Sequence, residues 1–150
     1  MLSFVAVKTI DDTELKDRLK SALTRSFERI APMAVEQIKD RIKSILTEKL
    51  AAWVPEDGAL DNFPFLKTST GFVESYLHCV RVETEGFFIG VIVDSDEAVR
   101  RGLPSEIGDL LEYGSSEFPQ LAHIREAMDL WVANEGRQLM EEMGKAPLQI

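Results

Sequence analysis

Apolar residues recur every three or four positions through most of residues 11–54, and this spacing constrains the fold more than any other feature. Such spacing is typical of helices that bury one side. The first apolar stripe consists of Leu15, Leu19, Ala22, Leu23, Phe27 and Ile30. The second consists of Val35, Ile38, Ile42, Ile45, Leu46, Leu50 and Trp53. Pro32 between them should end or kink the first helix near Ile30, or open the next helix as its first residue.

Two segments alternate instead, as half-buried strands do. Leu2 to Lys8 indicates a short N-terminal strand or an extended arm within residues 1–10. Residues 72–94 indicate a β-hairpin whose turn lies near Gly86. Its second strand has apolar residues on both sides, because Phe88 and Ile92 face away from Ile89 and its partners. Such a strand should be central in a sheet or covered at an interface.

The remaining segments complete a prediction of one α+β domain over residues 1–150. Residues 55–71 lack a period and contain proline and glycine, which favours a long loop. Residues 105–118 combine a short helix or strand with a glycine corner, and residues 119–143 form a long C-terminal helix before a tail at 144–150. We expect an N-terminal helical region and a small antiparallel sheet with a central hairpin, on which the C-terminal helix packs.

Charge is distributed unevenly along the chain. The net charge is −9, but residues 1–50 carry ten Lys and Arg against eight Asp and Glu. The acidic remainder argues against non-specific binding of nucleic acid, which needs cations to neutralise phosphates. It favours solubility, a surface that avoids DNA, or a basic partner. No apolar run is long enough to span a bilayer. The lone Cys79 suits a reducing compartment. We interpret its side chain as a small buried hydrophobic group.

The sequence offers no clear reactive site, and we expect no enzyme activity, no metal and no cofactor. Two histidines, His78 and His123, do not make a zinc site, which needs three or four close ligands. Ser115 and Ser116 lie near His123 without a nucleophile-elbow pattern. A small hydrolase that uses Ser116, His123 and a carboxylate is the enzymatic alternative.

One stretch combines aromatic, glycine and proline residues: Leu111-Glu112-Tyr113-Gly114-Ser115, followed by Phe118-Pro119. Gly114 allows a sharp turn, Ser115 can cap a helix, and Pro119 suits a first helical turn. These residues alone favour a plain connecting turn, and the alternative is a tight corner that carries Tyr113 and Phe118 outward as contact residues.

This corner resembles the tail-completion or neck proteins of tailed bacteriophages, also described as head–tail joining or minor tail components. Their signature Leu/Val-Glu-Tyr/Phe-Gly-Thr/Ser is matched from Leu111 to Ser115. A Thr-Gly pair before the hairpin is matched by Thr70-Gly71. The order of helical region, Thr-Gly, hairpin, glycine corner and final helix also agrees.

The resemblance implies a structural subunit of a hexameric or dodecameric ring around the DNA channel of the virion neck, assembled in the host cytoplasm. Its partners would be sister copies, the portal, adaptor or head-completion proteins, and the tail terminator or tail tube. DNA would pass without sequence-specific binding, and no membrane would be involved. Residues that we expect at subunit contacts are Leu111, Glu112, Tyr113, Gly114, Ser115, Phe118, Thr70, Gly71 and Phe88. The alternatives are a tail-terminator ring subunit and a small homodimeric binding module unrelated to phages.

Overall fold

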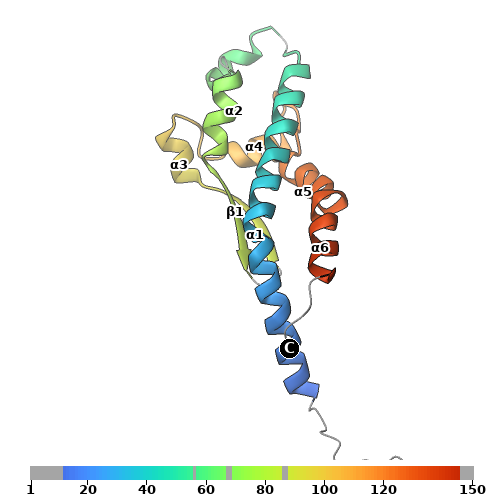
Figure 1. Cartoon of the computed structure of the whole chain (residues 1–150). Helices are drawn as coiled ribbons and strands as arrows, with labels where there is room; N and C mark the ends of the chain where they lie inside the picture. Colours follow the sequence, from blue (N-terminus) through green and yellow to red (C-terminus); the bar gives the residue numbers. More distant parts are fainter. Residues whose placement is uncertain (1–11, 56, 67–68, 86–87, 146–150) are drawn as a thin grey trace, which may run out of the picture.

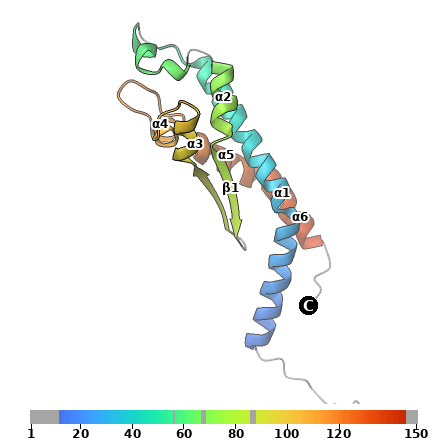
Figure 2. The same ribbon diagram turned by 90° about the vertical axis from the view of Figure 1, so that its left-hand side faces the viewer.

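A computed structural model describes residues 12–55, 57–66, 69–85 and 88–145. The predicted arm or strand at residues 1–10 and most of the tail lie outside the described residues. The α+β class is confirmed: the described residues form helices and one antiparallel hairpin, which lies beside α1 (Figures 1 and 2). The elements are α1 (Asp12–Ala52), η1 (Ala59–Asn62), η2 (Pro64–Leu66), α2 (Ser69–Leu77), β1 (Val80–Glu85), β2 (Phe88–Val93), α3 (Ser95–Arg100), α4 (Ile107–Tyr113), α5 (His123–Ala133) and α6 (Glu135–Lys145).

Helix α1 is one continuous helix of 41 residues, so Pro32 neither ends it nor starts a second one. Pro32 is exposed, between the buried Ala31 and Ala34. Because proline has no backbone N–H, the helix lacks one hydrogen bond there, and the ring stays outside the core. The helix bends along its length (Figure 2). Its N-terminal part projects beyond the rest of the protein, and residues 13–20 are exposed there (Figures 1 and 2).

The core is built around the central part of α1. Ile38, Ile42 and Leu46 are fully buried, as the second apolar stripe predicts. The helix packs against α2, β1, α5 and α6. Polar contacts also join α1 to the C-terminal helices: among them, Trp131 Nε1 donates to Gln37 Oε1 at 3.0 Å, and Arg41 pairs with Glu135.

The segment predicted as the first half of the hairpin begins as a helix. Residues 69–77 form α2, and only Val80–Glu85 form the strand. Phe72, Val73 and Tyr76 are buried, at the i, i+1, i+4 spacing of a helical face. The alternation prediction was therefore wrong before Val80. The predicted loop at 55–71 is also partly ordered into two short 3₁₀ helices and the start of α2.

Strands β1 and β2 form a two-stranded antiparallel sheet in which Val80 pairs with Val93 and Glu85 with Phe88. Val80 is buried and Val82, Ile89, Val91 and Val93 are partly buried against the core. Phe88 and Ile92 are exposed on the opposite face. The prediction of apolar residues on both sides of β2 is confirmed, but β2 is not a central strand among the described residues.

Two further helices lie between the hairpin and the corner. The connection after Asp94 contains α3, whose first turn is capped because Asp94 Oδ1 accepts the Glu97 N–H at 3.1 Å. This bond lowers the pKa of Asp94. Of the two states considered for residues 105–113, the structure has the helix, α4.

The C-terminal helical segment differs from the prediction in three ways. It begins at His123 rather than at Pro119, and it is broken at Asn134, where φ is −120° and ψ is −92°. Asn134 Nδ2 donates to the Leu130 carbonyl at 2.8 Å and closes α5. Helices α5 and α6 pack mainly on α1 rather than on the sheet. Gly136 permits this break, because a Cβ there would lie 2.9 Å from the Trp131 ring.

Candidate functional site

The glycine corner predicted at residues 111–119 is a tightly built turn between α4 and α5. Gly114 ends α4 with φ 74° and ψ −173°, and its N–H donates to the Leu110 carbonyl at 2.8 Å. A Cβ at Gly114 would lie 2.8 Å from the backbone nitrogen of Gln120. Only glycine fits both the backbone angle and the space.

Ser115 closes the turn from the other side. Its N–H donates to the Phe118 carbonyl at 2.8 Å, and its hydroxyl oxygen accepts the Phe118 N–H at 3.1 Å. This turn directs Phe118 into the core, where its ring packs edge-on against Trp53 and Phe63 at centroid distances of 4.9 and 5.2 Å. The expectation that Phe118 points outward was wrong, because these rings remove it from water.

Glu112 connects the corner to the start of α5. Its two carboxylate oxygens accept the backbone N–H groups of Ile124 and Arg125 at 2.8 and 3.1 Å. Helix α5 has no cap from its own preceding residue, because Ala122 adopts φ 49° and has no side-chain acceptor. A carboxylate from α4 thus satisfies free N–H groups and opposes the positive end of the α5 dipole.

A buried polar pair lies directly beneath this cap. Tyr76 Oη and His123 Nε2 are 2.6 Å apart, and both side chains are buried. His123 Nδ1 lies 3.2 Å from Glu112 Oε2 without the orientation of a hydrogen bond and has no other partner among the described residues. Burial, together with the positive charge of Lys49, lowers the pKa of His123 to about 4.

The neutral imidazole therefore fits a specific proton arrangement at pH 7. A ring proton on Nδ1 would face the Glu112 carboxylate, and we infer this tautomer because it leaves Nε2 free to accept from the Tyr76 hydroxyl. Burial also raises the pKa of Tyr76, so the phenol keeps its proton. The pair joins α2 to α5 and does not open to solvent.

Lys49 fixes the same corner to α1. Its Nζ donates to the Leu121 carbonyl at 2.6 Å and to Glu126 Oε1 at 2.6 Å. Three separate elements, α1, α2 and α4, thus hold the first residues of α5 by polar contacts. Sequence reasoning missed the contact of His123 with Tyr76 across 47 positions of sequence.

The residues expected at subunit contacts fall into two groups. Phe88 and Tyr113 are 72% and 70% exposed, and Gly71 and Ser115 are also exposed. The other group serves the chain's own fold: Leu111 and Phe118 are buried, Gly114 is the turn, and Glu112 is the cap. Thr70 lies in the first turn of α2, and its side chain is outside the description. The structure does not gather these residues on one surface patch.

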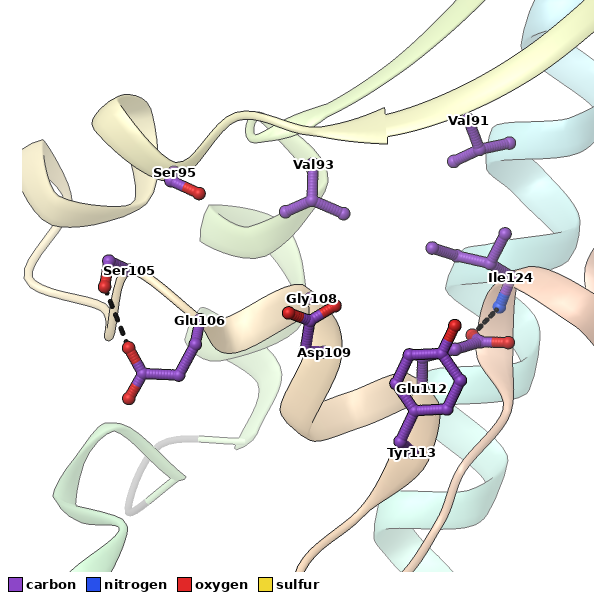
Figure 3. A pocket seen from close by; sticks show the side chains of 10 residues that line it. All are labelled: Val91, Val93, Ser95, Ser105, Glu106, Gly108, Asp109, Glu112, Tyr113 and Ile124. Carbon is purple, nitrogen blue, oxygen red and sulfur yellow. Dashed lines mark hydrogen bonds between the residues drawn. The ribbon is translucent and has the colours of Figure 1, made fainter.

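A groove of about 400 Å³ lies between β2, α4 and the start of α5 (Figure 3). Val91 and Val93 extend from the strand toward α4, and Ile124 completes the apolar wall. Polar side chains also line it: Ser95, Ser105, Glu106, Asp109, Glu112 and Tyr113. No residue of β1 contributes. The groove combines an apolar wall with three carboxylates, and the exposed aromatic residue Tyr113 also lines it.

The described residues provide little for catalysis. No cluster of three or more His, Cys, Asp or Glu side chains suited to a metal ion occurs among them. In the described part of the chain, His123 contacts Tyr76 and Glu112, and no hydrogen bond joins it to Ser116. The hydrolase alternative thus lacks its nucleophile–base contact in this conformation. Burial raises the pKa of Cys79, which makes its thiol a poor nucleophile.

Comparisons with protein-family models, with curated proteins and with solved structures gave no match. Within the described residues, no helix has the length and apolar content needed to cross a membrane.

Proposed function

We propose that this chain is a structural subunit of the ring that joins head to tail in a tailed bacteriophage, at the neck or tail-completion layer. One observation carries the proposal. Apolar side chains are exposed on two separate elements: Leu15 and Leu19 on α1, and Phe88 and Ile92 on the hairpin. Different surfaces on one subunit suit head-to-tail contacts, which close into rings.

The corner supports the same function through its construction. The residues of the Leu-Glu-Tyr-Gly-Ser signature form a rigid joint between α4 and α5, and Tyr113 alone among its large side chains is strongly exposed. Neck rings must hold their shape under the passage of DNA, so a subunit of this kind gains from a joint fixed by several elements. The acidic charge of residues 51–150 would let DNA slide past the lumen without binding.

The proposed partners follow from this position. Sister copies would form the hexameric or dodecameric ring, with portal, adaptor or head-completion proteins on one face and the tail terminator or tail tube on the other. The assembly site would be the host cytoplasm, and the final location the virion neck. A tail-terminator ring is the neighbouring layer with the same subunit geometry.

Mass photometry and negative-stain electron microscopy of the purified full chain test the proposal. We expect closed rings whose mass is a multiple of the 16.9 kDa subunit. Phe88→Ser should reduce ring formation, whereas Val99→Ser, at another exposed apolar residue on α3, should not. A chain that stays monomeric at high concentration overturns the proposal, and stable dimers favour the homodimeric binding module. The neighbouring genes give an independent check, because portal and capsid genes upstream and a tail-tube gene downstream would agree with a neck subunit.

A further inference from the structure

Strand β2 has an unpaired edge. The Asp94 N–H donates to the Cys79 carbonyl at 2.8 Å, which marks these two residues as a hydrogen-bonded pair of the hairpin. Because such pairs alternate in antiparallel ladders, Ile92 and Gly90 also direct their backbone groups toward β1. Ile89 and Val91 then direct theirs away from it. The described residues contain no third strand that pairs with them.

This edge has the properties of a strand-binding site. A two-stranded sheet is marginal without further cover, and an exposed apolar edge is a template for another strand. On the outer face of β2, Phe88 and Ile92 are exposed, and on the inner face Ile89, Val91 and Val93 are only partly buried. An added strand would therefore find apolar neighbours on both of its faces.

The groove in Figure 3 lies on the inner side of the same strand, lined by Val91 and Val93 but by no residue of β1. Alternate side chains of a strand added to β2 would enter this groove and meet its apolar wall. Asp109 of α4 and Glu106, the N-cap residue of that helix, would lie beside the added strand. The site thus favours an apolar, alternating segment that ends in a cation.

The first residues of this sequence have that character. Leu2 to Val7 consist of apolar residues and one serine, and Lys8 is the only charged side chain before Asp11. This segment lies outside the described residues and directly precedes the projecting part of α1. Ten extended residues span about 33–36 Å, whereas a six-residue strand such as β2 spans about 20 Å.

We propose that residues 2–7 of one copy pair with the free edge of β2 in the next copy and extend its two-stranded sheet to three strands. The inference rests on the proposed function, because it supplies the contact between neighbouring ring subunits. Lys8 would then lie near Glu106 and Asp109 of the receiving copy. Strand addition of this kind takes affinity from backbone hydrogen bonds and specificity from alternate side chains.

Cysteine cross-linking between copies tests the pairing. Single variants Phe4→Cys, Val5→Cys and Ala6→Cys, in a Cys79→Ala background, are each mixed with a tagged Ile92→Cys copy and oxidised. Paired strands place alternate residues on opposite faces. We therefore expect cross-linked dimers of one tagged and one untagged chain for one alternating set only, either Phe4→Cys and Ala6→Cys or Val5→Cys. The yield of cross-linked dimer from the other set should be at least about fivefold lower. Val99→Cys on α3 is the matched control for Ile92→Cys.

Two outcomes would overturn the inference. One is an absence of the alternating pattern, or cross-linking equal to that of the Val99→Cys control. The other outcome concerns a chain that carries both an arm cysteine and Ile92→Cys. A disulfide that forms only within such a chain would place the segment on its own β2. Circular dichroism of the Cys79→Ala background and of each arm variant checks that the fold is retained.

A second measurement separates this inference from the proposed function. Val5→Pro removes a backbone donor from the segment, whereas the control Val5→Thr keeps it, so only Val5→Pro should weaken self-association, by about tenfold or more. Deleting residues 2–7 should have the same effect without unfolding the monomer. Rings that form equally well in the wild type, Val5→Pro and the deletion variant refute the strand pairing and leave the neck proposal intact. Alternating cross-links in a chain that forms no rings refute the neck proposal and leave the pairing intact.

Discussion

Lowering the pH should destabilise this protein through one buried histidine. His123 is fully buried, and its pKa falls from the ordinary value of 6.5 to about 4 because burial disfavours the imidazolium and Lys49 repels it. Between these two pH values the unfolded chain binds a proton that the folded chain does not. Stability is therefore highest above pH 6.5 and decreases as the pH falls toward 4.

The size of this effect follows from the difference between the two pKa values. At about 1.4 kcal/mol per pH unit, the interval from 6.5 to 4 corresponds to about 3 kcal/mol. Domains are commonly stable by about 5–15 kcal/mol, so the loss is a large fraction of the total. Protonation would also break the acceptor role of Nε2 toward the Tyr76 hydroxyl, which loosens the contact between α2 and α5.

Urea unfolding at several pH values between 4 and 7 measures the effect. His123→Gln keeps a side-chain oxygen that can accept from Tyr76, and it should cost about 1–2 kcal/mol at pH 7. Between pH 7 and pH 4, the free energy of unfolding of His123→Gln should fall by about 3 kcal/mol less than that of the wild type. His78→Gln removes the other imidazole of the chain, an exposed one, and is the matched control.

The comparison of variants is necessary because carboxylates also titrate at low pH. Glu135, whose pKa is lowered by its hydrogen bond from Arg41, contributes stability that is lost as the pH falls below its ordinary value of 4.5. That contribution is common to the wild type and His123→Gln, so it cancels in their difference. Parallel stability curves for the two proteins, or an imidazole NMR titration of His123 with a midpoint near 6.5, would refute the reasoning.

Three substitutions test the corner and the C-terminal break by thermal or urea unfolding. Gly114→Ala should cost about 3 kcal/mol or more, since it adds a steric clash to an unfavourable φ, whereas Gly102→Ala, with φ 75° and open space, should cost about 1–2 kcal/mol. Equal losses would contradict the clash. Phe118→Ala should cost about 3–5 kcal/mol, and a loss below about 1 kcal/mol would show that the ring is not packed. Gly136→Ala should cost about 1–3 kcal/mol, because its Cβ would meet the Trp131 ring, and a gain in stability would mean that α5 and α6 can merge.

Local patterns predicted the elements where one periodicity was present without competition. The second apolar stripe located the buried face of α1, and the alternation of Ile89, Val91 and Val93 located the inner face of β2. Gly114 was correctly interpreted as a sharp turn, since a glycine after an apolar run with serine behind it has few other uses. These features depend on neighbours within a few residues.

The errors arose where two patterns overlapped or where a distant contact decided the outcome. From Phe72 to Val80 the apolar residues fit both periods, and packing of Phe72 and Tyr76 on neighbouring rings stabilises the helix. The Asn134 break depends on the fit of Gly136 beneath Trp131. The Tyr76–His123 pair and the Lys49 contacts join elements that are far apart in sequence, so no local spacing of residues predicts them.

The resemblance and the structure together separate the residues that define the fold from those that can meet a partner. In the Leu111–Ser115 signature, Leu111 fills the core, Glu112 caps α5 and Gly114 makes the turn, so the motif chiefly preserves a joint. A buried joint of this kind concerns the architecture of the chain and does not identify the surface that a neighbour would cover. In the proposed ring, subunit contacts would come from exposed side chains, among them Tyr113 at the groove and Phe88 on the hairpin. Both lie on the elements that frame the free edge of β2, and for this reason that edge is the place to look first for a sister copy.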